Sequence, residues 1–364
     1  MVCIPLSVMS SRAASTKKDF ALDYTAPYFE LFPSRVQSQY HEMQMAFSKL
    51  AKHVHICYSI KTNPHPKILE ALASRGCGME SVSLRELNAS KSFSTPKLFN
   101  SCASTKEELE IALKQNALII IDSLSQAKLL SSLIKKPLNV GMRVRFDLFR
   151  FGFAADEVPL AIEEMEKMNL RVILLHSHPG TNQSLSDYEK FISKFAALVK
   201  EFPSMEAIDI GGGFLGKELL RQKNISISDY AKLIQKHLGA FLKDKILYVE
   251  AGRYLVEDSM ELIAQIQHIK MMGPRAFAMM DAGINVLSKF TNSHYQYSAI
   301  TQSGETNRQF RLCGPSMFAS DEFGQLTGKL KEGDIIRIHN TGAYCTELAW
   351  NLSKDVPKIK VVET

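Results

Sequence analysis

The chain has 364 residues, of which 45% are hydrophobic and 23% charged, and its formal net charge is +6. This composition is that of a folded globular protein and excludes a disordered chain. The basic residues are scattered, with short pairs such as Lys17-Lys18, so no dedicated nucleic-acid-binding surface is indicated. No apolar run is long enough to span a bilayer. We therefore expect neither a nucleic acid nor a membrane as a partner.

The six cysteines lie far apart in the sequence and form no CxxC pair: Cys3, Cys57, Cys77, Cys102, Cys313 and Cys345. This spacing argues against a zinc site or any other metal centre and against a disulfide framework, and it favours a reducing cytoplasm. The segment "MVCIPLSVMSSR" has an apolar run that no positive region precedes, so we interpret it as a strand and not as a signal. Residues 1–18 contain no acidic residue, which leaves organelle targeting open.

From about residue 35, short apolar β-like runs alternate with amphipathic helical segments such as "STKEELEIALKQN". This alternation is typical of βα units on a parallel sheet. Eight such units in about 220 residues have the size of a (β/α)8 TIM barrel. The expected strands lie at residues 53–60, 77–82, 97–101, 118–122, 138–146, 171–178, 205–210 and 246–250.

After Arg253 the pattern changes to alternating, glycine-punctuated segments such as "SMELIAQIQHIK" and "GDIIRIHNTGAY". These predict antiparallel strands of a second, C-terminal all-β domain. We therefore assign residues 25–253 to the barrel and residues 254–364 to a β-sandwich or β-barrel domain. Residues 1–24 are assigned to this second domain as an added strand.

The residues at the strand ends are candidates for chemistry, because the loops there form the active face of a TIM barrel. Lys61 follows the run "HICYSI" and precedes Asn63-Pro64, which stops the strand. An isolated lysine at such a place usually just extends its ammonium into water. The other strands help to decide whether Lys61 has a chemical role. Their ends carry Glu80, His178, the loop "DIGGGF" (Asp209 to Phe214) and "VEAGR" (Val249 to Arg253), and Arg143 lies within the fifth strand.

The glycine triplet Gly211 to Gly213 suits a loop whose backbone N–H groups approach an anion closely. Phosphate sites after the seventh and eighth strands recur in TIM barrels, and Arg253 adds a guanidinium beside this loop. A plain tight turn is the alternative for the glycines.

Glu250 stands beside the glycine loop, where it either forms a salt bridge with Arg253 or Arg143 or keeps a pyridine nitrogen protonated. In the second case Lys61 supplies an amine for a Schiff base, and the site has the parts that a pyridoxal phosphate enzyme requires. His178 is then either a flat ring that stacks on the cofactor or a structural histidine.

Six motifs occur in the chain in this order: "YSIKTN", "HSHPGTN", "DIGGGF", "EAGR", "CGPSMFASD" and "GAY". Their order and spacing resemble the ornithine/diaminopimelate/arginine decarboxylase group, the alanine-racemase-like fold type III of pyridoxal phosphate enzymes. The likeness extends from about Tyr24 to the C-terminus. It implies pyridoxal 5'-phosphate as cofactor, an amino acid as substrate, and a homodimer with shared active sites.

By this resemblance, the ring of the cofactor meets Lys61, which binds it covalently, His178, which stacks on it, and Glu250, which contacts its nitrogen. Glu80 and Arg143 correspond to charges around the ring, and Glu80 replaces the more usual aspartate.

The phosphate, by the same resemblance, is held by Gly211 to Gly213, Gly252 and Arg253, and Tyr344 of "GAY" reaches it. Thr181 stands where the family has a serine and keeps the hydroxyl.

The departures from the family pattern lie in "CGPSMFASD". Met317 replaces a usual cysteine, and Phe318 replaces an acidic residue that meets a distal amino group. Asp321 is retained, and we expect it to pair with Arg150 of a second copy. The segment Leu287 to Tyr295 also lacks the usual pattern for a distal carboxylate.

The sequence thus predicts a pyridoxal phosphate-dependent decarboxylase of an α-amino acid, with an unusual or specialised substrate. A pyridoxal phosphate-dependent racemase and a catalytically altered regulatory homologue are the alternatives. Retention of Lys61, Glu250 and the glycine loop favours an enzyme, and "GGGF", "CGP" and "GAY" favour the decarboxylase branch.

Overall fold

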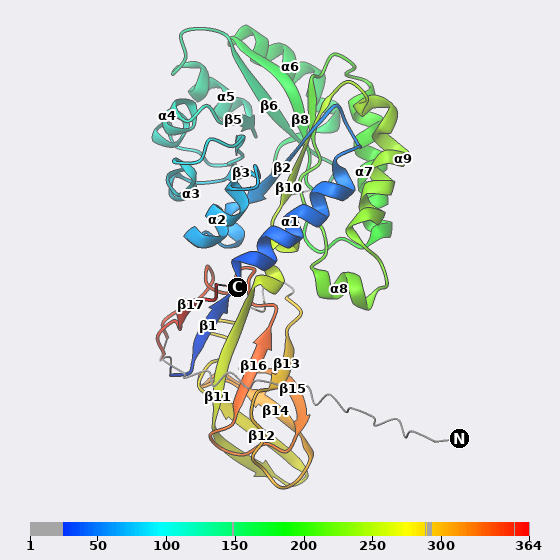
Figure 1. The fold of residues 1–364 in the computed structure, drawn as a ribbon. Helices are drawn as coiled ribbons and strands as arrows, with labels where there is room; N and C mark the ends of the chain where they lie inside the picture. Colours follow the sequence, from blue (N-terminus) through cyan, green and yellow to red (C-terminus); the bar gives the residue numbers. More distant parts are fainter. Residues whose placement is uncertain (1–24, 148, 288, 290–292, 353, 364) are drawn as a thin grey trace, which may run out of the picture.

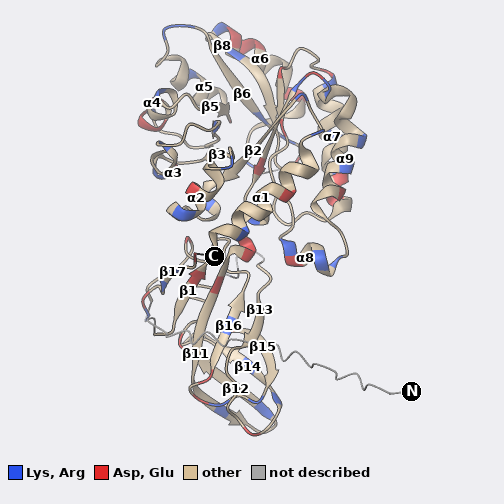
Figure 2. Cartoon of the chain, in the orientation of Figure 1, with Lys and Arg blue, Asp and Glu red and all other residues tan. Residues whose placement is uncertain are grey.

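The computed structural model describes residues 25–147, 149–287, 289, 293–352 and 354–363. The strand predicted within residues 1–24 lies outside the described residues. Two units are visible, a helix-surrounded barrel and a smaller unit made of strands (Figure 1). In this view, basic and acidic residues are interspersed over both units (Figure 2). No helix of the described part of the chain is long and apolar enough to cross a membrane.

Eight parallel strands form a closed barrel, which confirms the predicted TIM barrel. Their order is β5-β4-β3-β2-β10-β9-β8-β6, and the pairing of β5 with β6 closes the ring. A short strand, β7 (Phe153–Ala154), also pairs with β6. The barrel strands are β2 (His53–Ser59), β3 (Gly78–Ser81), β4 (Lys97–Phe99), β5 (Leu118–Ile121), β6 (Leu138–Arg145), β8 (Leu170–His176), β9 (Ala207–Asp209) and β10 (Ile246–Ala251).

The helices begin at recognisable caps and bury one apolar face against the barrel. In α4, for example, Thr105 and Glu108 form a capping box. Ten α-helices lie within the described residues: α1 (Pro33–Phe47), α2 (Pro66–Ala73), α3 (Leu84–Ser90), α4 (Lys106–Lys114), α5 (Leu124–Ser131), α6 (Val158–Lys167), α7 (Leu185–Lys200), α8 (Lys217–Gln222), α9 (Ile227–Leu242) and α10 (Arg253–Val256). Three short 3-10 helices are η1 (Ile60–Thr62), η2 (Ala155–Glu157) and η3 (Glu257–Ser259).

The second unit is a mostly antiparallel sheet, which confirms the predicted C-terminal all-β domain. The main path is β13-β16-β11-β12-β14-β15, and β1 lies between β11 and β17. Its strands are β1 (Tyr28–Leu31), β11 (Met260–Met272), β12 (Arg275–Met280), β13 (Gln296–Ala299), β14 (Arg308–Cys313), β15 (Glu322–Gly328), β16 (Ile335–His339) and β17 (Lys358–Val361). β1 belongs to this sheet although its residues precede the barrel; the domain limits given above stay a prediction.

The two units share one continuous cluster of buried apolar side chains. Near the junction, the N–H of Tyr344 donates to the carbonyl oxygen of Thr62, at 2.8 Å, and Tyr344 adopts a left-handed backbone with φ of 66°. This contact fixes the segment after β16 against η1, directly beside Lys61. The second unit thus reaches the carboxyl ends of the barrel strands.

Candidate active site

A cavity of about 390 Å³ opens at the carboxyl ends of the barrel strands. Residues from both units line it, because Tyr344 is held against the barrel. Ten of the predicted site residues meet there: Lys61, Glu80, Arg143, His178, Thr181, Gly213, Glu250, Gly252, Arg253 and Tyr344.

Lys61 lies in η1, one short turn beyond the end of β2, and its side chain is 44% exposed. Its Nζ lies 3.0 and 3.3 Å from the two carboxylate oxygens of Glu80, which is fully buried and also accepts from the hydroxyl of Ser59. Burial by itself lowers the pKa of Lys61, but Glu80 and then Glu250 raise it above its ordinary value. The amine is therefore held as a cation at a fixed place in the cavity.

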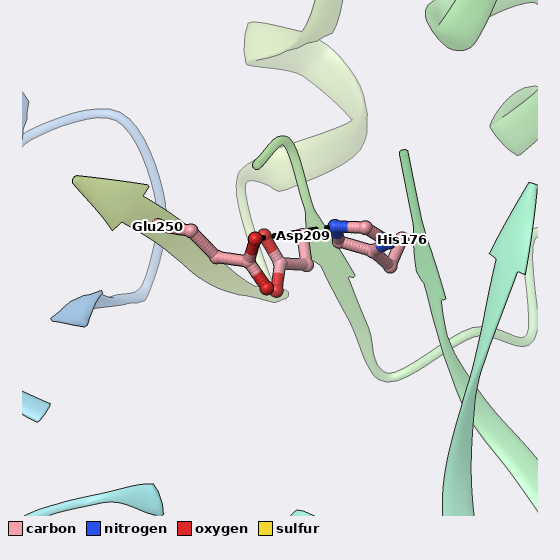
Figure 3. Close-up of side chains that lie close together, drawn as sticks. All are labelled: His176, Asp209 and Glu250. Atoms are coloured by element: carbon pink, nitrogen blue, oxygen red, sulfur yellow. Dashed lines mark ion pairs between the residues drawn. The ribbon is translucent and has the colours of Figure 1, made fainter. Parts of the chain in front are cut away.

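Glu250 lines the cavity. Its side chain and those of the fully buried Asp209 and His176 point toward one another (Figure 3). Its Oε2 lies 3.4 Å from Nε2 of His176, and its Oε1 accepts from the side-chain N–H of Asn100 at 3.1 Å. The alternative salt bridges to Arg253 and Arg143 are not among its interactions in the structure. We name the cavity-lining Glu250 and Asn100, together with His176 and Asp209 buried behind them, the cavity floor.

The two carboxyl groups of the cavity floor have opposite protonation tendencies. Burial and the neighbouring Glu250 raise the pKa of Asp209 well above its ordinary value. Burial, the largest single influence, acts to raise the pKa of Glu250, but His176, Lys61 and His178 together act against it and the net pKa is lowered. Glu250 is therefore the ionised carboxylate, and Asp209 is the protonated one.

The glycine loop allows close packing around His178. The N–H of Gly212 donates to Nδ1 of His178 at 3.1 Å, and a Cβ at Gly212 would collide with the carbonyl oxygen of Glu250. Burial lowers the pKa of His178 to about 3, so the ring is neutral and carries its proton on Nε2. Gly211 donates its N–H to Asp209 at 2.8 Å. Two of the three loop N–H groups thus have partners inside the protein.

Arg253 begins α10 and is buried at the edge of the cavity. Its Nη1 lies 2.5 Å from Oε1 of Glu257 and 3.2 Å from the hydroxyl of Ser293. Its guanidinium carbon lies 5.5 Å from the centre of the Tyr344 ring. The arginine is therefore fixed by both units at once.

Met317 and Phe318 do not line the cavity. Met317 is 99% exposed and Phe318 is half exposed, with its ring centre 6.0 Å from that of Trp350. In the single chain these side chains lie on the surface, and their action on a second copy stays a prediction.

Asp321 is buried and holds its own loop together. Its carboxylate accepts backbone N–H groups from Ile284, at 2.8 Å, and Ser316, at 2.9 Å. Arg150 stacks on Phe151, with 4.4 Å between the guanidinium carbon and the ring centre. The pairing of Asp321 with Arg150 of a second copy stays a prediction.

Several residues of the site had no role in the sequence analysis. His176 and Asp209 lie within the motifs "HSHPGTN" and "DIGGGF", which gave neither side chain a function of its own. Asn100 lies near the carboxyl end of the third expected strand, residues 97–101, so the strand-end rule makes it a candidate as well. Glu257 lies four residues after Arg253, the spacing at which side chains meet on a helix.

The cavity has a set of groups that fits pyridoxal phosphate. It offers an amine, a buried ionised carboxylate, a neutral aromatic ring and an arginine, and glycines stand where a Cβ would collide with Thr62 or Glu250. Such a set at the active face of a TIM barrel defines a pyridoxal phosphate enzyme of fold type III.

Comparison with known proteins identifies the family. The family model described as "Pyridoxal-dependent decarboxylase, pyridoxal binding domain" matches residues 34–257. The chain belongs to this family. It is a pyridoxal phosphate-dependent decarboxylase, a carboxy-lyase, and pyridoxal phosphate is its cofactor.

Individual relatives agree with this assignment. The diaminopimelate decarboxylase of Methanothermobacter thermautotrophicus is 25% identical over 365 residues, covering 90% of this chain and 84% of the relative. The crystal structure of diaminopimelate decarboxylase from Helicobacter pylori complexed with L-lysine matches with a TM-score of 0.84 at 22% identity, over 94% of this chain and 92% of that one. The lysine/ornithine decarboxylase of Vibrio vulnificus, complexed with putrescine, matches with a TM-score of 0.81 at 18% identity, over 93% and 95%.

Proposed function

We propose that the protein decarboxylates an α-amino acid other than the standard diaminopimelate or ornithine, with Lys61 as the residue that binds the cofactor. The observation that carries this proposal is the position of Lys61 and Glu250 in one cavity. When bound, pyridoxal phosphate supplies an electron sink for the electrons left behind as the carboxylate departs as carbon dioxide.

In this proposal Glu250 holds the proton of the pyridine nitrogen. The role requires a carboxylate that stays ionised although it is buried, and the contacts of Glu250 with His176 and Asn100 supply that condition. His178 contributes a neutral ring face, since its burial keeps it uncharged.

Glu80 controls the proton on Lys61. Its two contacts with Nζ hold the amine toward the cavity, and its burial strengthens the pairing. Glu80 favours the protonated amine. Burial raises the pKa of Glu80 itself, so this carboxylate can accept the proton when Lys61 has to be a neutral amine to attack.

The substrate is inferred from the departures at Met317 and Phe318. The relatives act on diaminopimelate, and the structural neighbours hold L-lysine or putrescine. A phenyl ring at position 318 carries no charge and cannot form a salt bridge with a distal ammonium. We therefore infer a substrate whose distal end is apolar or otherwise specialised.

A homodimer with shared active sites belongs to the same proposal. Met317, Phe318, Leu348 and Leu352 are all at least 45% exposed, and large exposed apolar side chains of this kind mark interaction surfaces. A second copy that covers them would bring residue 318 to the cavity of its partner. Sedimentation at working concentration tests this, and a stable, active monomer contradicts it.

A cytoplasmic location is also proposed. It rests on the cysteines, since Cys57, Cys77, Cys102, Cys313 and Cys345 are all free.

The test of the activity is a panel of amino acids, incubated with the protein loaded with pyridoxal phosphate. Released carbon dioxide and inverted substrate are measured in the same reactions. The proposal predicts carbon dioxide from at least one amino acid and a lower rate with diaminopimelate and ornithine. Inverted substrate without carbon dioxide would establish the racemase instead, and rapid turnover of diaminopimelate would contradict the substrate inference.

A further inference from the structure

The ion pair of Arg253 and Glu257 is unusually enclosed for a site that has to receive an anion. Both side chains are at most 4% exposed, and Nη1 lies 2.5 Å from Oε1. The carbonyl oxygen of Glu257 also accepts the N–H of Gly342, at 2.9 Å, two residues before Tyr344. The pair is thus built into the junction that positions the cavity wall.

Space for the carboxylate is provided by Gly216. A Cβ at this position would overlap the carboxylate of Glu257. Gly216 comes two residues after the loop "DIGGGF", so the segment that directly follows this loop leaves room for Glu257. The carboxylate is therefore accommodated by the fold and is not an accidental surface contact.

The charges of the pair have a direct consequence for anion binding. Arg253 lines the cavity, and its positive charge is balanced by Glu257. A phosphate that approaches this guanidinium meets a cation already paired with a carboxylate, and it brings more negative charge next to that carboxylate. In a buried place such charges are screened weakly.

We propose that Glu257 shares Arg253 with the phosphate of the cofactor, so that it stabilises the cofactor-free protein and weakens the hold on the phosphate. The inference rests on the proposed function, because it takes Arg253 as a phosphate ligand. Glu257 is a positioning residue and touches no reacting atom. The same pairing would weaken the binding of inorganic phosphate.

The test compares Glu257→Gln with the wild type, both stripped of cofactor. Binding is titrated by absorbance with pyridoxal phosphate and, separately, with pyridoxal, which lacks the phosphate. Removing one partner of a buried ion pair leaves an uncompensated charge, which the phosphate then compensates. We expect the cofactor-free variant to melt at a lower temperature and to bind pyridoxal phosphate about ten-fold more tightly, with pyridoxal binding unchanged.

The matched control is Glu261→Gln. Glu261, on β11, is also a buried glutamate, paired with Arg35 of α1 at 2.8 Å and with Arg337 of β16 at 3.2 Å. This variant should lose stability and keep the wild-type affinity for pyridoxal phosphate. An equal gain in affinity for both variants would overturn the inference.

Glu257→Asp covers the case in which Glu257→Gln does not fold. The shorter carboxylate weakens the pair, so the affinity for pyridoxal phosphate should rise by a smaller factor. Unchanged or weaker binding of pyridoxal phosphate in either folded variant overturns the inference. Such a result leaves the proposed function standing, whereas failure of the wild type to bind pyridoxal phosphate at all would refute the proposed function.

Discussion

The cavity floor and the loop 314–321 differ in almost every physical respect. The floor consists of buried side chains at or just beyond the carboxyl ends of barrel strands, where Asn100 donates a hydrogen bond to Glu250 and His176 pairs with Glu250. The loop belongs to the second domain, and it exposes Met317 and Phe318 while only Asp321 is fixed inside it. Residues of the first kind can be assigned a chemical task within one chain. Those of the second kind acquire one only through a substrate or a second copy.

Replacing Lys61 should give the largest effect on activity. Lys61→Ala removes the only amine among the described residues that line the cavity, so turnover should fall by at least about three orders of magnitude. The protein should stay folded, because the side chain is partly exposed, but its melting temperature should drop, because the buried Glu80 loses its cation. Carbon dioxide release and thermal melting measure the two effects. Lys67→Ala, which affects an exposed lysine paired with Glu70, should leave both unchanged.

Within the cavity floor, Glu250 and Asp209 provide a matched pair of substitutions. Glu250→Gln removes the ionised carboxylate and should lower kcat about 100-fold. Asp209→Asn replaces a group that is already neutral and should lower kcat less than about ten-fold. Equal losses in the two variants would show that the assignment of the charge to Glu250 is wrong.

His178 should make stability depend on pH. Its pKa is about 3 in the folded protein, where burial disfavours the charged ring, and about 6.5 in an unfolded chain. The unfolded state therefore binds more protons between these values, and stability falls as the pH drops from about 6.5 toward 3. His178→Gln should flatten this part of the curve, as measured by melting temperature against pH. A curve that matches the wild type would contradict the buried neutral histidine.

The smallest effect is expected at the loop 314–321. A thioether has no acidic proton, so Met317 cannot protonate the carbon that has lost its carboxylate. Met317→Cys should lower the fraction of turnovers that end in pyridoxamine phosphate, which chromatography can measure. Met45→Cys serves as the control, because Met45 is also an exposed methionine but lies on α1. If Met317→Cys leaves the pyridoxamine phosphate fraction unchanged, position 317 takes no part in the protonation step.

Much of the barrel and of its site could be predicted from the sequence because the signals are local. Short apolar runs followed by amphipathic segments give the strands, and the strand-end rule leads directly to Lys61, Glu80 and Glu250. The rule does not fix strand ends to the residue. The expected strand 171–178 ends at His178, whereas β8 ends at His176, so His178 lies in the loop that follows.

The features that were missed depend on contacts between distant parts of the chain. The strand β1 has four residues, and its partner Ile263 lies more than 200 residues from Tyr28. Asn100 looks like an ordinary loop residue until it meets Glu250, which is 150 residues away. The pairing of Arg253 with Glu257 was at helical spacing, but its burial depends on Gly216 and on the second domain.

The most direct test of the central claim is borohydride reduction of the cofactor-loaded protein, followed by peptide mapping. If Lys61 is the amine that holds pyridoxal phosphate, the label will be found on the peptide that contains "YSIKTNPHPK", and Lys61→Ala will lose it. A label on any other lysine, or a labelled Lys61→Ala variant that still releases carbon dioxide, would contradict the account.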